Sequence, residues 1–278
     1  ASKALAVIAG VGPGTDGLHL HPLIPHKQEG LAEKEQGASI ARKFAKTYSV
    51  AVLGRNPGNY NPIVQEINSS GGQAIGISAD VSDSKSVNDA FDKIQAQYPS
   101  SKVAAAVFNP GGGFVVKPFL ELTEEDYSTA LKSQAYVFAV SCTYSTPIIL
   151  TDLAKSLAPN QAGAFNFAQR AIPLLLQARE SSEYPPTLIF TGATASLKGS
   201  AKFAAFASSK FALRALAQSL AREFGPQGIH VSHTVIDGVI DIPRTKAWVF
   251  EHEDAKLSPD AVSPALVIGC FILETHLL

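Results

Sequence analysis

The sequence predicts an α/β fold in which a doubly wound parallel sheet forms a single domain. Short apolar runs, such as 4–9 (ALAVIA) and 103–108 (VAAAVF), end at glycine or turn residues, as strands buried on both faces do. Helical stretches with one apolar stripe lie between them, most clearly at 204–224, where Leu213 and Leu220 share a face. Strands and helices that alternate in this way are typical of α/β domains. The 278 residues, 46% of them hydrophobic, suffice for one sizeable core.

Composition and charge argue against nucleic acid and membranes as partners. The formal net charge is −1 and no long run of lysine or arginine occurs, so we expect neither nucleic acid nor a membrane surface as the main partner. The first residues show no signal peptide, and the apolar run at 265–273 is too short to cross a bilayer. The two cysteines, Cys142 and Cys270, form no disulfide framework. A reducing compartment, and by default a cytoplasmic location, is expected.

A glycine-rich turn follows the first strand. Read literally, glycines 12, 14 and 17 match the dinucleotide fingerprint, but two prolines and no helical period follow them. A convincing helix begins only at Gly37, and joining Thr15 to Gly37 gives the text AGVGPGTGASIARKFAK. The segment 16–36 is therefore interpreted as an insertion. We expect the glycines on both sides of it to bind a dinucleotide phosphate: Gly10, Gly12, Gly14 and Gly37.

Two further observations bear on ligands. His19, His21 and His26 in the inserted segment have no carboxylate or cysteine beside them, so no metal site is expected. The second strand, 50–53, is followed by Arg55 and by no acidic residue, and the next three residues, Asn56-Pro57-Gly58, are expected to form a turn. An acid there would bind the ribose hydroxyls of NAD, whereas an arginine pairs with the 2′-phosphate of NADP. The sequence favours NADP over NAD, unless Arg55 is an ordinary solvated arginine.

The stretch 187–225 carries the most specific pattern. Phe206 and Lys210 stand four apart on its helix, so their side chains point the same way. This strand, loop and helix resemble the catalytic segment of the short-chain dehydrogenase/reductase family, whose signature is Tyr-x-x-x-Lys. Phe206 takes the place of the tyrosine and Ala193 that of the serine thirteen positions earlier. The alternative for Lys210 is a solvated helix lysine.

The resemblance implies roles for these positions. In the family the tyrosine is the general acid/base, the serine polarises the substrate oxygen, and the lysine binds the nicotinamide ribose and lowers the tyrosine pKa. Phenylalanine has no ionisable proton, so the usual transfer cannot occur at Phe206. Lys210 is retained, and Thr191 and Thr194 are neighbours that could replace the serine. We therefore take Lys210 and Thr194 as the catalytic candidates.

The resemblance extends along the chain and implies a Rossmann-like fold. The joined glycine turn is similar to the family's T-G-x-x-x-G-x-G except at Ala9. Asp80-Val81 occupies the place of an Asp-Val pair beside the adenine, although Asp80 could instead cap the helix from Ser84. The run 109–112 resembles Asn-Asn-Ala-Gly, which implies that Asn109 steadies the sheet and Gly111 lets the cofactor approach. Asp237-Gly238 occupies the place of a Pro-Gly pair in the family.

Three segments depart from the family pattern: 16–36, 137–162 and 262–278. Deleting the second joins Gln134, at the place of a family asparagine, to the helix from Gly163. The family makes dimers and tetramers through this helix and the 204–224 helix, so a homo-oligomer is expected if the inserts are absent. We interpret the segments as translated introns, since introns begin with GT and end with AG. Two of the segments begin with valine, whose codons start with GT, and two close at or beside glutamine, of which CAG is one codon. The alternative is genuine surface loops.

Three functions remain open. The first is an NAD(P)-dependent oxidoreductase that moves a hydride to or from a small carbonyl or alcohol with altered acid/base residues. The second is a dinucleotide-binding protein without catalysis. The third is a mis-spliced, inactive product. The sequence indicates no particular substrate.

Overall fold

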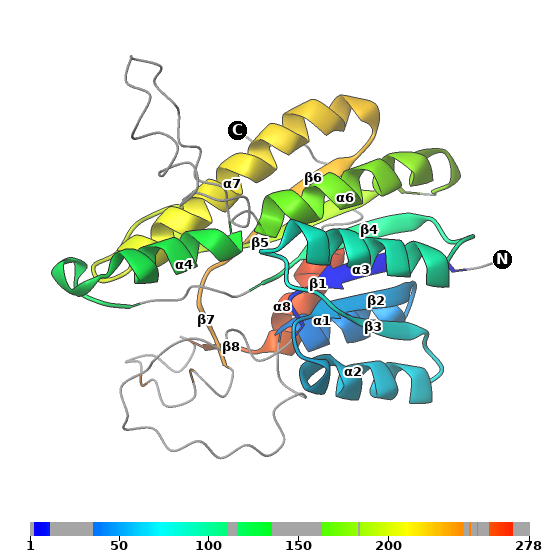
Figure 1. The fold of residues 1–278 in the computed structure, drawn as a ribbon, viewed down its shortest axis with the longest axis horizontal. Coiled ribbons are helices and arrows are strands. Elements are labelled where there is room, and N and C mark those ends of the chain that lie inside the picture. Colours follow the sequence, from blue (N-terminus) through cyan, green and yellow to red (C-terminus); the bar gives the residue numbers. More distant parts are fainter. Residues whose placement is uncertain are drawn as a thin grey trace.

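A computed structural model describes residues 3–11, 36–110, 116–134, 163–182, 184–241, 245, 249 and 256–268. Its centre is a six-stranded parallel sheet with the order β3-β2-β1-β4-β5-β6 (Figure 1). This order confirms the predicted doubly wound parallel sheet. The strands are β1 (Leu5–Ala9), β2 (Ser49–Gly54), β3 (Ala74–Ser78), β4 (Val103–Phe108), β5 (Thr187–Ala193) and β6 (His230–Ile236).

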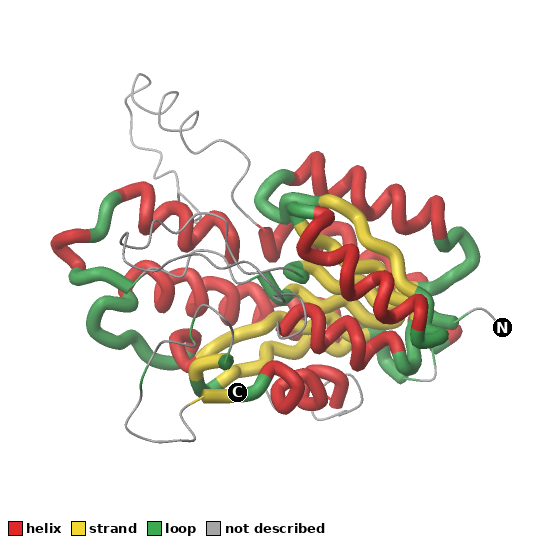
Figure 2. The backbone as a smooth tube through the Cα atoms, turned by 90° about the horizontal axis from the view of Figure 1, so that it is seen from below, coloured by secondary structure: helices red, strands yellow, loops and turns green. Residues whose placement is uncertain are grey.

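Helices cover both faces of the sheet, and Figure 2 shows the strands between them. On one face α3, α6 and α7 pack against β1, β4 and β5, and on the other α1 and α2 pack against β1 and β2. A small sheet of β7 (Val239–Ile240) and β8 (Lys256–Leu257) follows the main sheet. The helices are α1 (Gln36–Ala45), α2 (Pro57–Ser69), α3 (Ser84–Gln97), α4 (Glu124–Gln134), α6 (Gly163–Ala178), α7 (Ala204–Phe224) and α8 (Pro259–Ile268). The 3₁₀ turns are η2 (Phe119–Glu121), η3 (Arg179–Ser181), η4 (Thr194–Ser196) and η5 (Gly225–Gln227).

The strand β1 shows why the strands read as continuous apolar runs. Its residues alternate between the two faces, so Leu5 and Val7 enter one core and Ala6 and Ile8 enter the other. All of β1 is buried. A strand with a core on both sides has no polar face. For this reason the uninterrupted apolar run predicted a buried strand here.

Two local expectations need correction. Asn56-Pro57-Gly58 was expected to form a turn, but Asn56 is the N-cap of α2, its side-chain oxygen accepting from the backbone N–H of Gly58 at 2.9 Å. Pro57 starts the helix, where its missing N–H costs nothing. The cap of α3 is Asp83, which accepts from Lys85 N, so Asp80 does not have the capping role.

The structure describes different shares of the three segments that depart from the family pattern. Residues 137–162 lie outside the described residues; α4 ends at Gln134 before them and α6 begins at Gly163 after them. Of the first segment only Gln36 is described, as the first residue of α1. The third was expected to begin at Val262, but α8 continues through that position to Ile268 and packs against α1. The predicted start of the third segment, Val262, therefore lies inside a helix.

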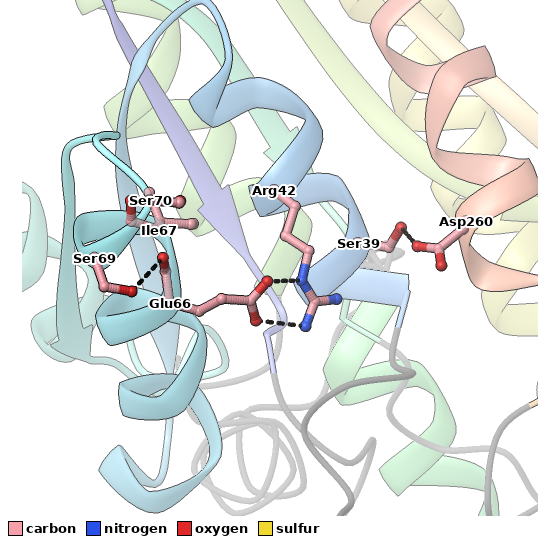
Figure 3. A network of polar contacts seen from close by, with 7 residues as sticks. All are labelled: Ser39, Arg42, Glu66, Ile67, Ser69, Ser70 and Asp260. Atoms are coloured by element: carbon pink, nitrogen blue, oxygen red, sulfur yellow. Dashed lines mark hydrogen bonds and ion pairs between the residues drawn. The ribbon is translucent and has the colours of Figure 1, made fainter.

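Side-chain contacts hold α1 on both flanks (Figure 3). Toward α2, the Arg42 guanidinium donates twice to the Glu66 carboxylate, at 2.7 and 2.8 Å. These hydrogen bonds hold the pKa of Glu66 below its ordinary value. Toward α8, the buried Ser39 hydroxyl donates to the Asp260 carboxylate. The position of α1 is therefore fixed by its neighbours as well as by its packing on the sheet.

Candidate active site

The sheet order places the site at the carboxyl ends of the strands. The chain leaves β1 toward β2 on one side and reaches β4 on the other, so the order reverses at β1. In open α/β sheets, ligands bind outside the carboxyl ends at such a reversal. The described site candidates that follow these strands, Gly10, Arg55, Asp80, Val81, Asn109 and Thr194, lie at this edge.

Gly10, Gly37 and Asn109 meet at the reversal point. Gly10 has φ +87°, and a side chain there would lie 2.5 Å from Pro110 N and 2.6 Å from the carbonyl carbon of Asn109. A side chain on Gly37 would collide with the carbonyl oxygen of Gly10. The Asn109 amide donates to that same oxygen at 3.3 Å. This hydrogen bond joins the ends of β4 and β1 and agrees with the expected role of Asn109 in steadying the sheet. Gly12, Gly14 and Gly111 lie outside the described residues.

The start of α1 suits an anionic group. The helix begins at Gln36, and its first turn carries no acidic residue. Free backbone N–H groups at a helix N-terminus attract phosphate. The side-chain nitrogen of Gln36 is buried and has no hydrogen-bond partner among the described residues. A glycine-lined edge with an unpartnered donor fits a dinucleotide phosphate.

Arg55 and Asp80 follow the next two strands. Arg55 comes directly after β2 and is exposed, so its guanidinium is accessible to a ligand. One Asp80 oxygen accepts from Ser82 N at 2.9 Å and from the Ser82 hydroxyl at 2.6 Å. The carbonyl of Val81 accepts from the Asn166 amide of α6 at 3.1 Å. Sequence reasoning missed Asn166, since nothing along the chain links α6 to this turn.

Lys210 is a buried lysine. Its ammonium donates to the carbonyl of Thr191 at 2.9 Å, and its nitrogen lies 5.8 Å from the centre of the Phe206 ring. The residue is 5% exposed, so the alternative of a solvated helix lysine is wrong. Burial lowers the pKa of Lys210 from 10.5 to about 8. The structure therefore brings Phe206 and Lys210 together at the end of β5.

The serine position lies beside a second polar pair. Ala193 is the last residue of β5 and pairs with Ile236, the last residue of β6. The next residue, Thr194, donates its hydroxyl to the Asp237 carboxylate at 2.5 Å; the carbonyl of Ile236 is farther away, at 3.5 Å. The η4 turn that carries Thr194 packs against α7 and β6. Sequence reasoning placed Thr194 here but missed its partner Asp237.

His233 is a further polar residue that the sequence did not single out. It lies on β6 opposite Phe190, and its ring packs so closely on Gly192 that a side chain there would lie 2.5 Å from Nε2. Burial lowers its pKa to about 4, and the positive charges of Lys210 and Arg214 add to this effect. Its buried Nε2 has no hydrogen-bond partner among the described residues. We expect a neutral imidazole beside the lysine.

Within the described parts of the chain, every helix is too short or too polar to span a bilayer. Three or more His, Cys, Asp or Glu side chains do not gather in a way that could hold a metal ion anywhere in the described residues. His19, His21 and His26 lie outside the described residues.

Solved structures share the fold along nearly the whole chain. A short-chain dehydrogenase from Rhodopseudomonas palustris is 28% identical, with a TM-score of 0.63 and coverage of 95% of this chain and 90% of its own. A metagenomic short-chain oxidoreductase in complex with NADP is 16% identical, with a TM-score of 0.66 and coverage of 100% and 95%. Hydroxysteroid dehydrogenase from Escherichia coli is 20% identical, with a TM-score of 0.68 and coverage of 96% and 89%.

Sequence comparison identifies the family. No curated protein matches the chain at a significant level. The family model for short chain dehydrogenases matches residues 33–249, which begins within the first departing segment and ends before the third. The match includes β2 to β6 and both Phe206 and Lys210. The chain therefore belongs to the short chain dehydrogenase family.

Proposed function

We propose that this protein is an NADP-dependent oxidoreductase that acts on a small carbonyl compound or alcohol. The observation that carries the proposal is the buried Lys210, whose ammonium is anchored on the Thr191 carbonyl at the carboxyl end of β5. Burying a charged lysine costs several kcal/mol unless it serves an interaction that repays the cost. A cofactor ribose at this edge would supply such an interaction.

The residues at the sheet edge fit the cofactor. Gly10 and Gly37 let the end of β1 lie against the first turn of α1, whose backbone N–H groups would bind the pyrophosphate, and the Asn109 amide holds the carbonyl of Gly10. Arg55 is exposed where a 2′-phosphate would lie, and Asp80 and Val81 border the adenine end. The bound NADP of one similar structure supports this choice. When bound, the nicotinamide ring supplies the hydride donor or acceptor.

Proton transfer must use other groups than the family's tyrosine and serine. Phe206 and Ala193 have no exchangeable proton. The polar side chain next to Ala193 is Thr194, so we place the proton transfer at the end of β5 where Thr194 lies. Lys210, with its pKa lowered to about 8, provides a positive charge beside this region in neutral solution. We expect the activity in the cytosol, as the small number of cysteines suggests.

The test separates binding from turnover. Titration of the protein with NADPH, followed by the fluorescence of the bound nucleotide, should give saturable binding that Lys210→Met weakens. Lys198→Met removes an exposed lysine near the same loop and serves as the matched control. Turnover of a panel of small ketones, quinones and alcohols is then measured. Binding without turnover of any substrate would replace the enzyme proposal by a dinucleotide-binding protein, and absence of binding would refute both.

A further inference from the structure

Asp237 carries an ionisable group beside the position where the chain lacks the family's serine. The serine position, Ala193, is paired across the sheet with Ile236, and Asp237 is the next residue. Its side chain therefore projects from the carboxyl end of β6, beside the end of β5. The sequence resemblance places a family proline at this position, so the carboxylate is a feature of this chain.

Thr194 orients this carboxylate. One oxygen of Asp237 accepts the Thr194 hydroxyl at 2.5 Å, while Asp237 as a whole is exposed. The other oxygen has no hydrogen-bond or ion-pair partner among the described residues, and because Asp237 is exposed a substrate can reach it. A hydroxyl has one proton to donate. Because Thr194 gives that proton to Asp237, it is poorly placed to donate it to a substrate.

We propose that Asp237 is the acid/base residue of this protein and that Thr194 is a positioning residue that holds it. The inference rests on the proposed oxidoreductase function and deepens it, since it says where the proton goes. A base that is within reach of substrate and oriented by a third group is the arrangement that general catalysis uses. The role of the family's tyrosine, whose position is Phe206 on α7, thus passes to a carboxylate that directly follows β6.

The balance of the step is simple. In alcohol oxidation the substrate O–H bond breaks and its proton passes to the free oxygen of Asp237. The C–H bond breaks and its hydrogen leaves with the electron pair as a hydride, for which the nicotinamide of bound NADP would be the acceptor, while the C=O bond forms. Asp237 then returns the proton to water. Carbonyl reduction runs the same step backwards, with protonated Asp237 as the acid.

Other charged groups lie on the elements around β6. Lys210 and Arg214 are on α7, His233 is on β6 itself, and Lys198 follows η4. The Lys256–Asp241 pair, 4.0 Å apart, belongs to the small sheet that follows. The pH dependence of the reaction must be assigned against these groups, so each variant below is compared with the parent over the whole pH range.

The kinetic test uses the full chain with NADP and the substrate of the panel that the parent turns over fastest. Asp237→Asn keeps the size and the hydrogen bond from Thr194 but cannot take a proton. We expect kcat to fall by roughly 10²–10⁴-fold. The part of the pH profile that depends on this carboxyl in the parent should disappear. Thr194→Val should lower kcat by about tenfold, and Thr194→Ser should restore it. Asp89→Asn, on an exposed carboxylate of α3, is the control.

A second readout does not depend on turnover. NADPH affinity should be the same in the parent, Asp237→Asn and Asp89→Asn. If the parent turns over substrate and Asp237→Asn keeps its kcat and pH profile, the inference is wrong while the proposed function stands. If the parent binds NADPH but turns over nothing, the proposed function fails and the inference fails with it.

Discussion

Gly10 after β1 and Gly37 in α1 lie in backbone contact, although 16–36 separates them in the sequence. No side chain fits between the carbonyl oxygen of Gly10 and the start of the helix. The N-terminus of α1 thus lies directly against the end of β1. The segment 16–36 therefore does not prevent the contact between Gly10 and the first turn of the helix.

Gly37→Ala tests this contact. The added methyl group would push α1 away from Gly10, since neither backbone segment is the flexible end of a side chain. We expect a loss of about 1–3 kcal/mol in the free energy of unfolding and weaker NADPH binding. Urea unfolding and fluorescence titration measure the two effects. Gly199→Ala, where a side chain would meet nothing within 4 Å, is the control, and equal behaviour of the two variants would contradict the contact.

Arg55 determines the choice of nucleotide if the exposed guanidinium after β2 pairs with a 2′-phosphate. NADPH should then bind more tightly than NADH, and Arg55→Asp should invert the order, because a carboxylate repels the phosphate and accepts from the ribose hydroxyls. The ratio of the two dissociation constants is the measurement, and Lys43→Asp on α1 controls for a general charge effect. An unchanged ratio in Arg55→Asp would refute the NADP assignment.

Phe206 leaves room for a test by restoration. Phe206→Tyr with Ala193→Ser would give the chain both missing hydroxyls, and Lys210, 5.8 Å from the ring, would depress the pKa of the new phenol. We expect faster reduction of small ketones and quinones with NADPH in the double variant, measured as kcat/KM between pH 6 and 9. The double variant made with Asp237→Asn should retain this gain. A slower double variant would show that the parent already has an efficient proton donor.

Burial of Lys210 predicts a specific dependence of stability on pH. Its pKa is lowered from 10.5 to about 8 in the folded protein, so between these values the unfolded chain holds a proton that the folded chain has released. The free energy of unfolding should therefore rise with pH across this window, by about 3 kcal/mol from Lys210 alone. Urea unfolding at pH 7 and pH 10 measures the change. The difference between parent and Lys210→Met isolates it, because other groups titrate in both; no difference would contradict the burial.

Removal of 16–36 and 137–162 should change both binding and assembly. Without the second segment, α4 and α6 become continuous, and the exposed aromatics Tyr127, Phe165 and Phe211 lie on α4, α6 and α7. We expect tighter NADPH binding, a higher melting temperature and a homo-oligomer, measured by light scattering. A monomeric product with unchanged affinity would refute this prediction. Sequencing mature messages tests the intron interpretation, which fails if all of them carry the segments.

The strands and the principal helix were predictable from sequence because each depends on its own composition. β1 and β4 are buried on both faces and therefore apolar throughout, and α7 shows its stripe through Leu213 and Ala217. The Phe206–Lys210 pair was predictable because helical periodicity alone places the two side chains on one face. Such local relations can be derived from spacing.

The contacts that complete the site could not be derived in this way. Thr194 meets Asp237, 43 positions later, and Asn166 reaches Val81, 85 positions earlier. The burial of His233 beside Lys210 also depends on how α7 crosses β6. These relations follow from sheet register and helix placement, which no local pattern encodes. The turn expected at Asn56 failed for the opposite reason, since Asn-Pro-Gly begins a turn and a helix equally well.

The hydrogen bond from Ser39 to Asp260 joins residues 221 positions apart, whereas Arg42 and Glu66 are separated by only 24. During synthesis at about 5–20 residues per second, the α2 side of α1 becomes available within seconds, and the α8 side follows roughly 10–40 s later. A nascent chain that has emerged only as far as β6 therefore has its complete parallel sheet but a helix α1 supported on one flank. On the ribosome, α1 should become held on both flanks only after α8 has emerged.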